Sequence, residues 1–212
     1  MKCGLITILA GGIALSIYAA EPGQNENWKV VKQNSGLTIY SRLHPGSRLK
    51  EFKAVGEIDA TTETVHKVIN DFESYPSFMP YTVECRLIKR EGDSVYSYQR
   101  LSPRIIADRD YTLCVHEKSW PCQSGLVYFS EWEPANQFGP GEKPGVLRVK
   151  LTEGSWLLEP DGPDKTRATY SIYTDSGGKL PPFVANFASE IGIGKIFAAV
   201  RKQATDPKYQ VK

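Results

Sequence analysis

Histidines are the residues of this sequence best suited to acid–base or metal chemistry, and there are three of them. His44 falls in an expected loop, His66 on an expected helix and His116 in an expected strand. Three residues so far apart in the sequence do not show the spacing of a metal site. We therefore interpret each as a solvated or singly hydrogen-bonded histidine, and we expect no metal and no cofactor.

Motifs that carry catalytic chemistry are missing from the sequence. It contains no G-x-S-x-G nucleophile elbow, no H-E-x-x-H zinc motif and no cysteine pair at metal-ligand spacing. The glycine-rich stretch 139–145 precedes a strand rather than a helix, which does not fit a phosphate-binding loop. We expect the protein not to be an enzyme. If it were one, its acid–base candidates would be Glu57, Arg100 and Glu190.

Length and charge limit the remaining classes of protein. A chain of 212 residues fits one large domain, and its 41% hydrophobic and 24% charged residues are ordinary for a folded protein. The net charge is only +2, and lysines and arginines are scattered rather than gathered in a stripe, so we expect no nucleic-acid partner. We expect a monomer.

The first twenty residues have the pattern of a secretory signal peptide. Lys2 precedes an apolar run from Leu5 to Ala20, and a polar linker over 21–27 follows. The run is shorter than the ~20 apolar residues that span a bilayer. We therefore expect export to the periplasm or out of the cell. The bulky Tyr18 near the cleavage site leaves an uncleaved membrane anchor as the alternative.

From Trp28 onward the sequence predicts one α+β domain over 28–203, with a tail over 204–212. A helix is expected over 62–72 and a long C-terminal helix begins near Pro182, with an apolar stripe that continues to Ala198. The expected strands, separated by turn signals, are 28–32, 37–43, 51–58, 82–89, 94–101, 111–117, 126–133, 146–158 and 166–174. Such a meander implies an antiparallel sheet that curls around the long helix.

Several short segments, taken in order, resemble a known family. They are Arg109-Asp110-Tyr111, then GSWLLEP at 154–160, TYSIYTDSGG at 169–178 and LPPFVAN at 180–186. This succession resembles the START lipid-transfer domains, which belong to the helix-grip superfamily together with plant pollen allergens and polyketide cyclases. The resemblance covers about 28–202.

The resemblance implies a lipid held between the sheet and the C-terminal helix, with the helix moving to admit it. We expect non-catalytic binding and transfer of a lipid or another hydrophobic molecule, with transient membrane contact. A cyclase or dehydratase of the same superfamily is the alternative, and a filled core would indicate an interaction module. Sterol-binding relatives carry a buried arginine at the position of Val115, so we do not expect a sterol.

The alternation of side chains along strands predicts which residues face the ligand. Tyr111, Leu113 and Val115 should point inward, whereas Thr112, Cys114 and His116 should point outward. Tyr96, Tyr98 and Arg100 share one face of their strand, where the tyrosines could contact ligand or pack in the core. The residues expected to line the ligand are Tyr96, Tyr98, Arg100, Tyr111, Leu113, Val115, Tyr170, Phe183, Asn186, Phe187 and Ile191.

Polar residues near these positions allow more than one interpretation. Asn186 could contact the ligand or hydrogen-bond the loop at 175–178. Arg109 and Asp110 are interpreted as a structural anchor rather than as ligand contacts, because adjacent residues on a strand point to opposite faces.

Export would leave three cysteines in an oxidising compartment, which allows one disulfide bridge at most. Cys114 and Cys122 are separated by eight residues and an expected turn, so a bridge between them is plausible. Cys85 is expected to be a buried free thiol.

Overall fold

The computed structural model describes residues 27–103, 106–178 and 180–210. The expected signal segment and nearly all of the expected linker lie outside these ranges.

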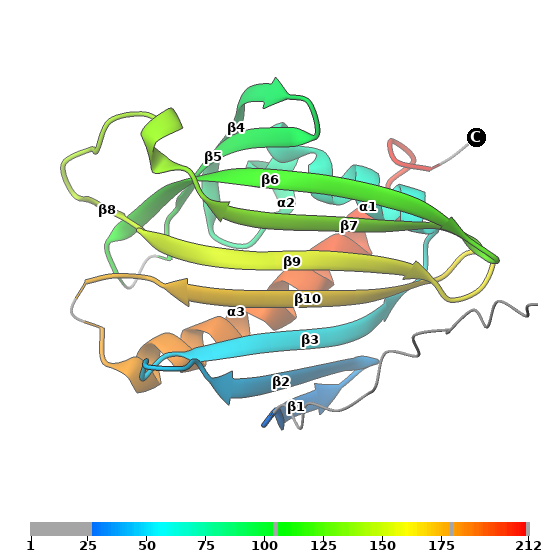
Figure 1. Cartoon of the computed structure of the whole chain (residues 1–212), viewed down its shortest axis with the longest axis horizontal. Helices are drawn as coiled ribbons and strands as arrows, with labels where there is room; N and C mark the ends of the chain where they lie inside the picture. Colours follow the sequence, from blue (N-terminus) through cyan, green and yellow to red (C-terminus); the bar gives the residue numbers. More distant parts are fainter. Residues whose placement is uncertain (1–26, 104–105, 179, 211–212) are drawn as a thin grey trace, which may run out of the picture.

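One antiparallel sheet dominates the described structure, with its strands in the order β1-β2-β3-β10-β9-β7-β6-β5-β4 (Figure 1). The short strand β8 adds to it by pairing parallel with the beginning of β6. The strands are β1 (Lys29–Asn34), β2 (Leu37–Leu43), β3 (Lys50–Ile58), β4 (Thr82–Glu91), β5 (Ser94–Leu101), β6 (Asp108–Cys122), β7 (Gly125–Pro134), β8 (Val146–Arg148), β9 (Leu151–Pro160) and β10 (Thr166–Asp175).

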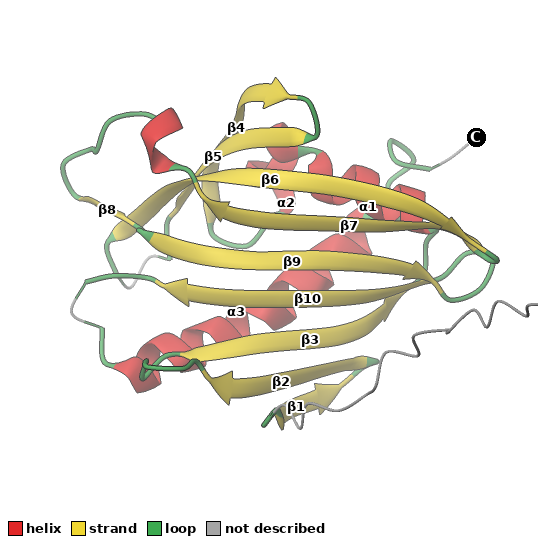
Figure 2. Cartoon of the chain, viewed as in Figure 1, coloured by secondary structure: helices red, strands yellow, loops and turns green. Residues whose placement is uncertain are grey.

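All of the described helices but one lie on the same face of this sheet, and the short helix η2 lies on the other face (Figure 2). The longest, α3 (Pro182–Gln203), crosses behind the strands, and α1 (Thr62–Asn70) lies beside its C-terminal part. The short helices η1 (Phe72–Ser74) and α2 (Tyr75–Phe78) pack against β4, and η2 (Asn136–Phe138) against β6. We call the face toward α3 the inner face and the opposite one the outer face. This arrangement confirms the expected α+β helix-grip fold.

Local sequence signals explain where α1 begins. The Thr61 side chain accepts a hydrogen bond of 3.2 Å from the backbone N–H of Thr64, and Glu63 lies in the positively polarised first turn. Val65, Val68 and Ile69 then form a buried stripe at helical spacing. The prediction of this helix is confirmed, with its end two residues earlier than expected.

The main core lies where α1 and the C-terminal half of α3 meet β2, β3, β9 and β10. Ile193, Phe197 and Val200 supply the contribution of α3, and all three are buried. Gly56 on β3 makes room for them, because a Cβ there would come within 2.9 Å of the Phe197 ring. A second, smaller buried cluster lies under β4, β5 and β6 and includes Cys85, Val95 and Leu113.

Two of the predicted strands differ most from the structure in their extent. The strand expected over 146–158 is divided into β8 and β9, which have different partners. The strand expected to end at Glu117 continues as β6 to Cys122, with Pro121 inside it. Beyond His116, β6 pairs with β7 but no longer with β5, so this stretch is an edge where proline is tolerated.

Candidate functional site

The pairing of β5 with β6 defines the inner face at the centre of the site. Val115 lies opposite Val95, Leu113 opposite Ser97, and Tyr111 opposite Gln99. Leu113, Val115 and Val95 belong to the second buried cluster, and Tyr111 packs against it. The prediction that Tyr111, Leu113 and Val115 share the inward face is therefore confirmed.

Tyr170 enters the same interior from β10. Its ring lies 4.6 Å from that of Trp156 and 5.7 Å from that of Trp132, and burial raises the pKa of its hydroxyl well above the ordinary value. Tyr111 has its pKa raised by the same cause. Both hydroxyls therefore stay protonated and act as neutral hydrogen-bonding groups.

The inner face of β5 carries polar residues that the sequence analysis did not single out. The Tyr111 hydroxyl donates a hydrogen bond of 3.1 Å to Gln99 Oε1. Ser97 is fully buried, and its Oγ has no hydrogen-bond partner in the part of the chain that the structure describes. On β5, Ser97 and Gln99 alternate with Tyr96 and Tyr98, so the sequence does show that the two sets lie on opposite faces. The prediction placed the tyrosines on the inner face, whereas the structure places Ser97 and Gln99 there.

Tyr96, Tyr98 and Arg100 lie on the outer face, which corrects the prediction that they line the ligand. Tyr96 packs edge-on against Phe138 of η2, and Arg100 pairs with Asp108 at 2.6 Å. These positions alternate with the inward Val95, Ser97 and Gln99.

Tyr98 is fully buried on that outer side, under the segment that contains η2 and β8. Its hydroxyl donates a hydrogen bond of 3.1 Å to Asp110 Oδ2. Burial, together with this carboxylate, raises the pKa of Tyr98 to about 12. Arg148 of β8 completes the group, because its Nε donates to Asp110 Oδ1 at 2.7 Å and its Nη2 donates to Oδ2 at 3.0 Å. Asp110 therefore anchors the fold, as the structural interpretation predicted.

Arg109 lies on the inner face, on the opposite side of β6 from Asp110. Only 6% of its surface is exposed, and among the described residues its Nε has no hydrogen-bond partner. Its Nη1 donates to the backbone carbonyl of Ala107. Burial alone lowers the pKa of this guanidinium. The structural interpretation thus accounts for Asp110 but leaves Arg109 without an acidic partner.

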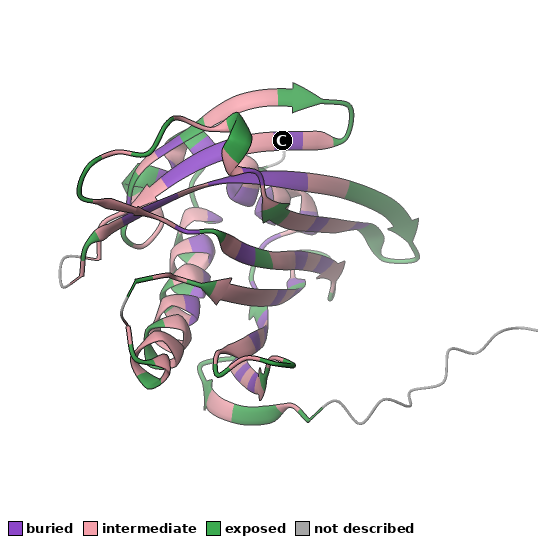
Figure 3. Ribbon diagram, turned by 60° about the vertical axis from the view of Figure 1, so that its left-hand side comes forward, coloured by how far each residue is buried: buried purple, intermediate pink, exposed green. Residues whose placement is uncertain are grey.

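The apolar stripe predicted for α3 is displaced by one residue. The side chains that contact the sheet are Ile193, Phe197 and Val200, whereas Phe183 is 74% exposed and Phe187 63% exposed. The buried class on α3 is accordingly found toward its C-terminal part (Figure 3). One residue corresponds to about 100° around a helix. The prediction that these two phenylalanines face the sheet was therefore wrong.

Ile191 is half-buried, and Asn186 lies between the two exposed rings in sequence. The Asn186 Oδ1 accepts a hydrogen bond of 3.0 Å from the backbone N–H of Lys50 at the start of β3. This bond is not the one expected with the loop at 175–178, which is closed by Asp175 Oδ1 accepting from Gly177 N–H instead.

The proposed disulfide between Cys114 and Cys122 is excluded by their place on one strand. Both cysteines are free, and eight residues of extended β6 separate their Cα atoms by about 26 Å. A disulfide requires no more than about 7 Å. Cys85 is a buried free thiol as predicted, and burial raises its pKa to about 12.

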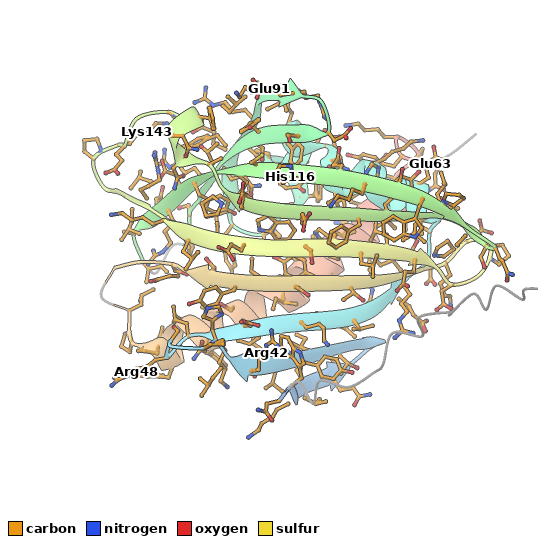
Figure 4. The ribbon with its side chains drawn as sticks, viewed as in Figure 1. Arg42, Arg48, Glu63, Glu91, His116 and Lys143 are labelled. Atoms are coloured by element: carbon orange, nitrogen blue, oxygen red, sulfur yellow. The ribbon has the colours of Figure 1, made fainter. Side chains whose placement is uncertain are left out.

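The three histidines occupy separate places in the described structure. His66 Nε2 lies 3.3 Å from Glu117 Oε1, and His44 Nδ1 lies 2.5 Å from Glu51 Oε1. His116 is on the outer face, where Figure 4 shows it on β6. Within 27–103, 106–178 and 180–210, no three histidine, cysteine or acidic residues form a group that could hold a metal ion.

Two open surface hollows lie in the described part of the chain. One, of about 500 Å³, lies between α1, Glu117 and the C-terminal Lys208 and Tyr209. The other, of about 480 Å³, lies on the outer face between Trp28 and Tyr173. Neither is lined by α3, so neither is the ligand space expected between the sheet and that helix.

Comparison with known proteins matches this fold to a family. Residues 58–201 match the family of polyketide cyclases/dehydrases and lipid transport proteins. The chain belongs to this family. Its match extends from the end of β3 to the last turn of α3, so it includes the inner face of β5 and β6 and nearly all of α3, but not β1, β2 or most of β3.

Proteins similar to this chain include lipid-transfer proteins. An uncharacterised protein of Pseudomonas aeruginosa is 28% identical over 162 residues, covering 76% of this chain and 78% of the relative. Mouse phosphatidylcholine transfer protein is 27% identical over 172 residues, covering 79% and 78%. A STAR-related lipid transfer protein from Xanthomonas axonopodis shares the fold, with a TM-score of 0.76, 24% identity, and coverage of 85% of this chain and 100% of that one.

Proposed function

We propose that this protein binds a lipid between the inner face of the sheet and the N-terminal half of α3, and transfers it between membranes. The observation that carries the proposal is the uneven packing of α3. Its C-terminal half supplies buried core residues, whereas the half nearest Pro182 leaves Phe183 and Phe187 exposed. A helix anchored at one end can swing at the other end without unfolding the domain.

The inner face of β5 and β6, against which Phe72 of η1 and Tyr75 of α2 pack, has the chemistry that a lipid needs. Leu113, Val115 and Val95 offer apolar contact, and burial of each methylene stabilises the complex by about 0.8 kcal/mol before ordering costs. Gln99 and Tyr111 offer neutral hydrogen-bonding groups for a polar linker. Neither of the two hollows described above is lined by α3, so in this proposal the lipid enters when the N-terminal half of α3 moves outward.

The exposed phenylalanines of α3 supply the membrane contact in this proposal. Phe183 and Phe187 are four residues apart and therefore project from the same side of the helix. Within the described residues, α3 is the one helix long and apolar enough to cross a bilayer. Its C-terminal half is committed to the protein core, so surface contact by its first turns fits the structure better than a membrane span.

A cyclase or dehydratase activity would require acid–base groups directed at the bound molecule. Of the three residues considered for that role, Glu57 pairs with Lys165 at 3.3 Å and Arg100 pairs with Asp108, both on the outer face. Glu190 is half-buried on α3. The named relatives that transfer phosphatidylcholine also favour a carrier.

We further propose that the carrier works outside the cytoplasm, on the basis of the signal-like residues 1–20. The test is fractionation of the native source, followed by sequencing of the mature N-terminus. A cytoplasmic protein that retains Met1 would contradict export.

The carrier function is tested by purifying the protein without denaturation and identifying co-purifying molecules by mass spectrometry after solvent extraction. We expect a stoichiometric lipid, and transfer of labelled lipid between donor and acceptor vesicles. A protein that carries no lipid and shows no thermal shift across a panel of lipids would contradict the proposal.

A further inference from the structure

The charges around the start of β6 do not balance, and the excess positive charge is at Arg109. Three arginines and two aspartates gather there. Arg100 pairs with Asp108 at 2.6 Å, and Arg148 pairs with Asp110 at 2.7 Å. Both pairs lie on the outer face of the sheet, so neither aspartate is directed at Arg109.

Arg109 is instead buried on the inner face. In the described residues its Nε lacks any hydrogen-bond partner, and its Nη1 is satisfied only by the carbonyl of Ala107. A buried charge without a counterion is costly, and proteins avoid it unless the charge has a partner. An arginine in this position therefore has the properties of a binding group that waits for an anion.

The residues beyond Arg109 on the inner face follow a regular order of polarity. The register places Arg109 first, then the hydrogen-bonded pair Tyr111–Gln99, then Ser97 with its unpartnered hydroxyl. Val115 and Val95 follow at the apolar end. A cation, then neutral hydrogen-bonding groups, then apolar surface is the complement of an amphiphile with an anionic head, a polar linker and an acyl tail.

The segment that leads into α3 lies beside this arginine. Leu147 of β8 pairs with Arg109, and a Cβ on Gly177 would come within 2.8 Å of the Leu147 side chain. Gly177, which precedes α3 in the chain, is thus packed on the strand next to Arg109. Outward movement of the N-terminal half of α3 would open a path to the guanidinium.

We propose that Arg109 binds the anionic group of the lipid, a phosphate or a carboxylate, and so makes this carrier selective for anionic amphiphiles. The inference rests on the proposed carrier function. A guanidinium offers two parallel N–H donors to such a group, and charged hydrogen bonds of this kind change an affinity by about tenfold or more.

The test compares wild type with Arg109→Gln, Arg109→Lys and the control Arg100→Gln. The control removes a positive charge from the outer face of the same hairpin. Each protein is incubated with vesicles of equal phosphatidylglycerol and phosphatidylcholine, repurified, and analysed by native mass spectrometry. We expect wild type and Arg100→Gln to retain mostly the anionic lipid, Arg109→Gln to lose that preference by about tenfold, and Arg109→Lys to keep part of it.

Two outcomes of this experiment separate the two proposals. If Arg109→Gln keeps the wild-type lipid ratio, or if wild type shows no preference, the anion site is wrong while the carrier function stands. If wild type retains no lipid at all, the carrier function itself fails. Titration with inorganic phosphate alone distinguishes a free anion from a lipid, because binding of phosphate without selection of anionic lipid would overturn the amphiphile assignment.

Melting temperatures separate a binding role from a structural role. Because Arg109 has no acidic partner, Arg109→Gln should melt at or above the wild-type temperature, and added anionic lipid should raise its melting temperature less than that of wild type. Arg148→Gln should melt lower, because it leaves the buried Asp110 unpaired. An equally large decrease for Arg109→Gln would show that Arg109 serves the fold and would overturn the proposal.

Discussion

In the C-terminal half of α3, Ile193 and Phe197 are at most 2% exposed, whereas in its N-terminal half Phe183 and Phe187 are 74% and 63% exposed. The C-terminal half is also tied to the sheet by Arg201, whose guanidinium donates to the backbone carbonyls of Ser35, Gly36 and Glu57. The N-terminal half contributes the bond between Asn186 and Lys50. We call the C-terminal half the anchored end and the N-terminal half the open end.

The difference between the two ends indicates how one helix can serve both stability and exchange. Buried apolar surface, which provides most of the folding free energy, is concentrated at the anchored end. Displacing the open end would expose little additional apolar surface of α3 and break few hydrogen bonds. Local opening there should therefore cost much less than global unfolding. Substitutions at the anchored end should therefore change the free energy of unfolding, and substitutions at the open end should change membrane binding and lipid transfer.

The largest expected loss of stability follows from Phe197→Ala at the anchored end. The ring is fully buried and lies 5.3 Å from Trp156, so its removal leaves a cavity in the main core. We expect the free energy of unfolding to fall by about 3–5 kcal/mol, measured by urea denaturation. A loss below about 1 kcal/mol would show that this end is not the stable one.

A smaller loss is expected from Gly56→Ala, which adds one methyl group at the same place. The new Cβ would lie 2.9 Å from Phe197 Cε1 and 3.0 Å from Leu37 Cδ1. Overpacking of this kind costs about 1–3 kcal/mol. Gly192→Ala on α3 is the matched control, because its added Cβ meets nothing within 4 Å, and it should be neutral or stabilising. Equal effects in the two variants would contradict the packing argument.

A still smaller, pH-dependent contribution is expected from the pair that ties α1 to β6. His66 lies against Glu117 and lowers the pKa of that carboxyl from its ordinary 4.5. A lowered carboxyl pKa stabilises the folded state above pH 4.5, and this stabilisation is lost as the pH falls through the folded pKa. Partly exposed pairs contribute at most about 1 kcal/mol.

The pH prediction is tested by urea denaturation of wild type and Glu117→Gln between pH 3 and 7, roughly the range over which a carboxyl titrates. The difference in stability between the two proteins should be greatest near neutral pH and should narrow at acid pH. Glu63→Gln on the exposed side of α1, labelled in Figure 4, is the control and should show a smaller difference. A difference that does not change with pH would rule out the ion pair as its cause.

Sequence patterns predicted the elements of this fold well, because turn residues and apolar periodicity define strands and helices locally. The strand bounds at Leu37–Leu43 and Ser94–Leu101 match the prediction. Which face of a strand points toward the interior was less predictable. Side chains on both faces of β5 are buried, with Tyr98 on one side and Ser97 on the other, so alternation does not show which face is inner.

The same limit applies to α3 and to the cysteines. Apolar residues surround α3 almost completely from Phe183 to Val200, so the sequence does not fix which side packs on the sheet. Cys114 and Cys122 appeared to lie across a turn because Pro121 was interpreted as a turn residue, whereas the hairpin turns only after Cys122. The sequence does not show that Arg109 lacks an acidic partner, because this depends on the pairing of Asp108 with Arg100 and of Asp110 with Arg148 in the folded structure.

The smallest effect on stability, and the sharpest test of the comparison, comes from Phe183→Ser combined with Phe187→Ser at the open end. Both rings are mainly solvent-exposed, so their loss should change the free energy of unfolding by no more than about 0.5 kcal/mol. Binding to vesicles, measured by flotation, and transfer of labelled lipid should nevertheless fall markedly, because the apolar contact with the bilayer is removed.

The matched control is Leu126→Ser, which removes an exposed apolar side chain from the β6–β7 hairpin, away from the start of α3 (Figure 1). It should leave vesicle binding and transfer unchanged. If the double variant unfolds as easily as Phe197→Ala, the first turns of α3 belong to the core and the two ends do not differ. If it is stable and transfers lipid at the wild-type rate, the open end is free but does not contact the membrane, and lipid must enter by another route.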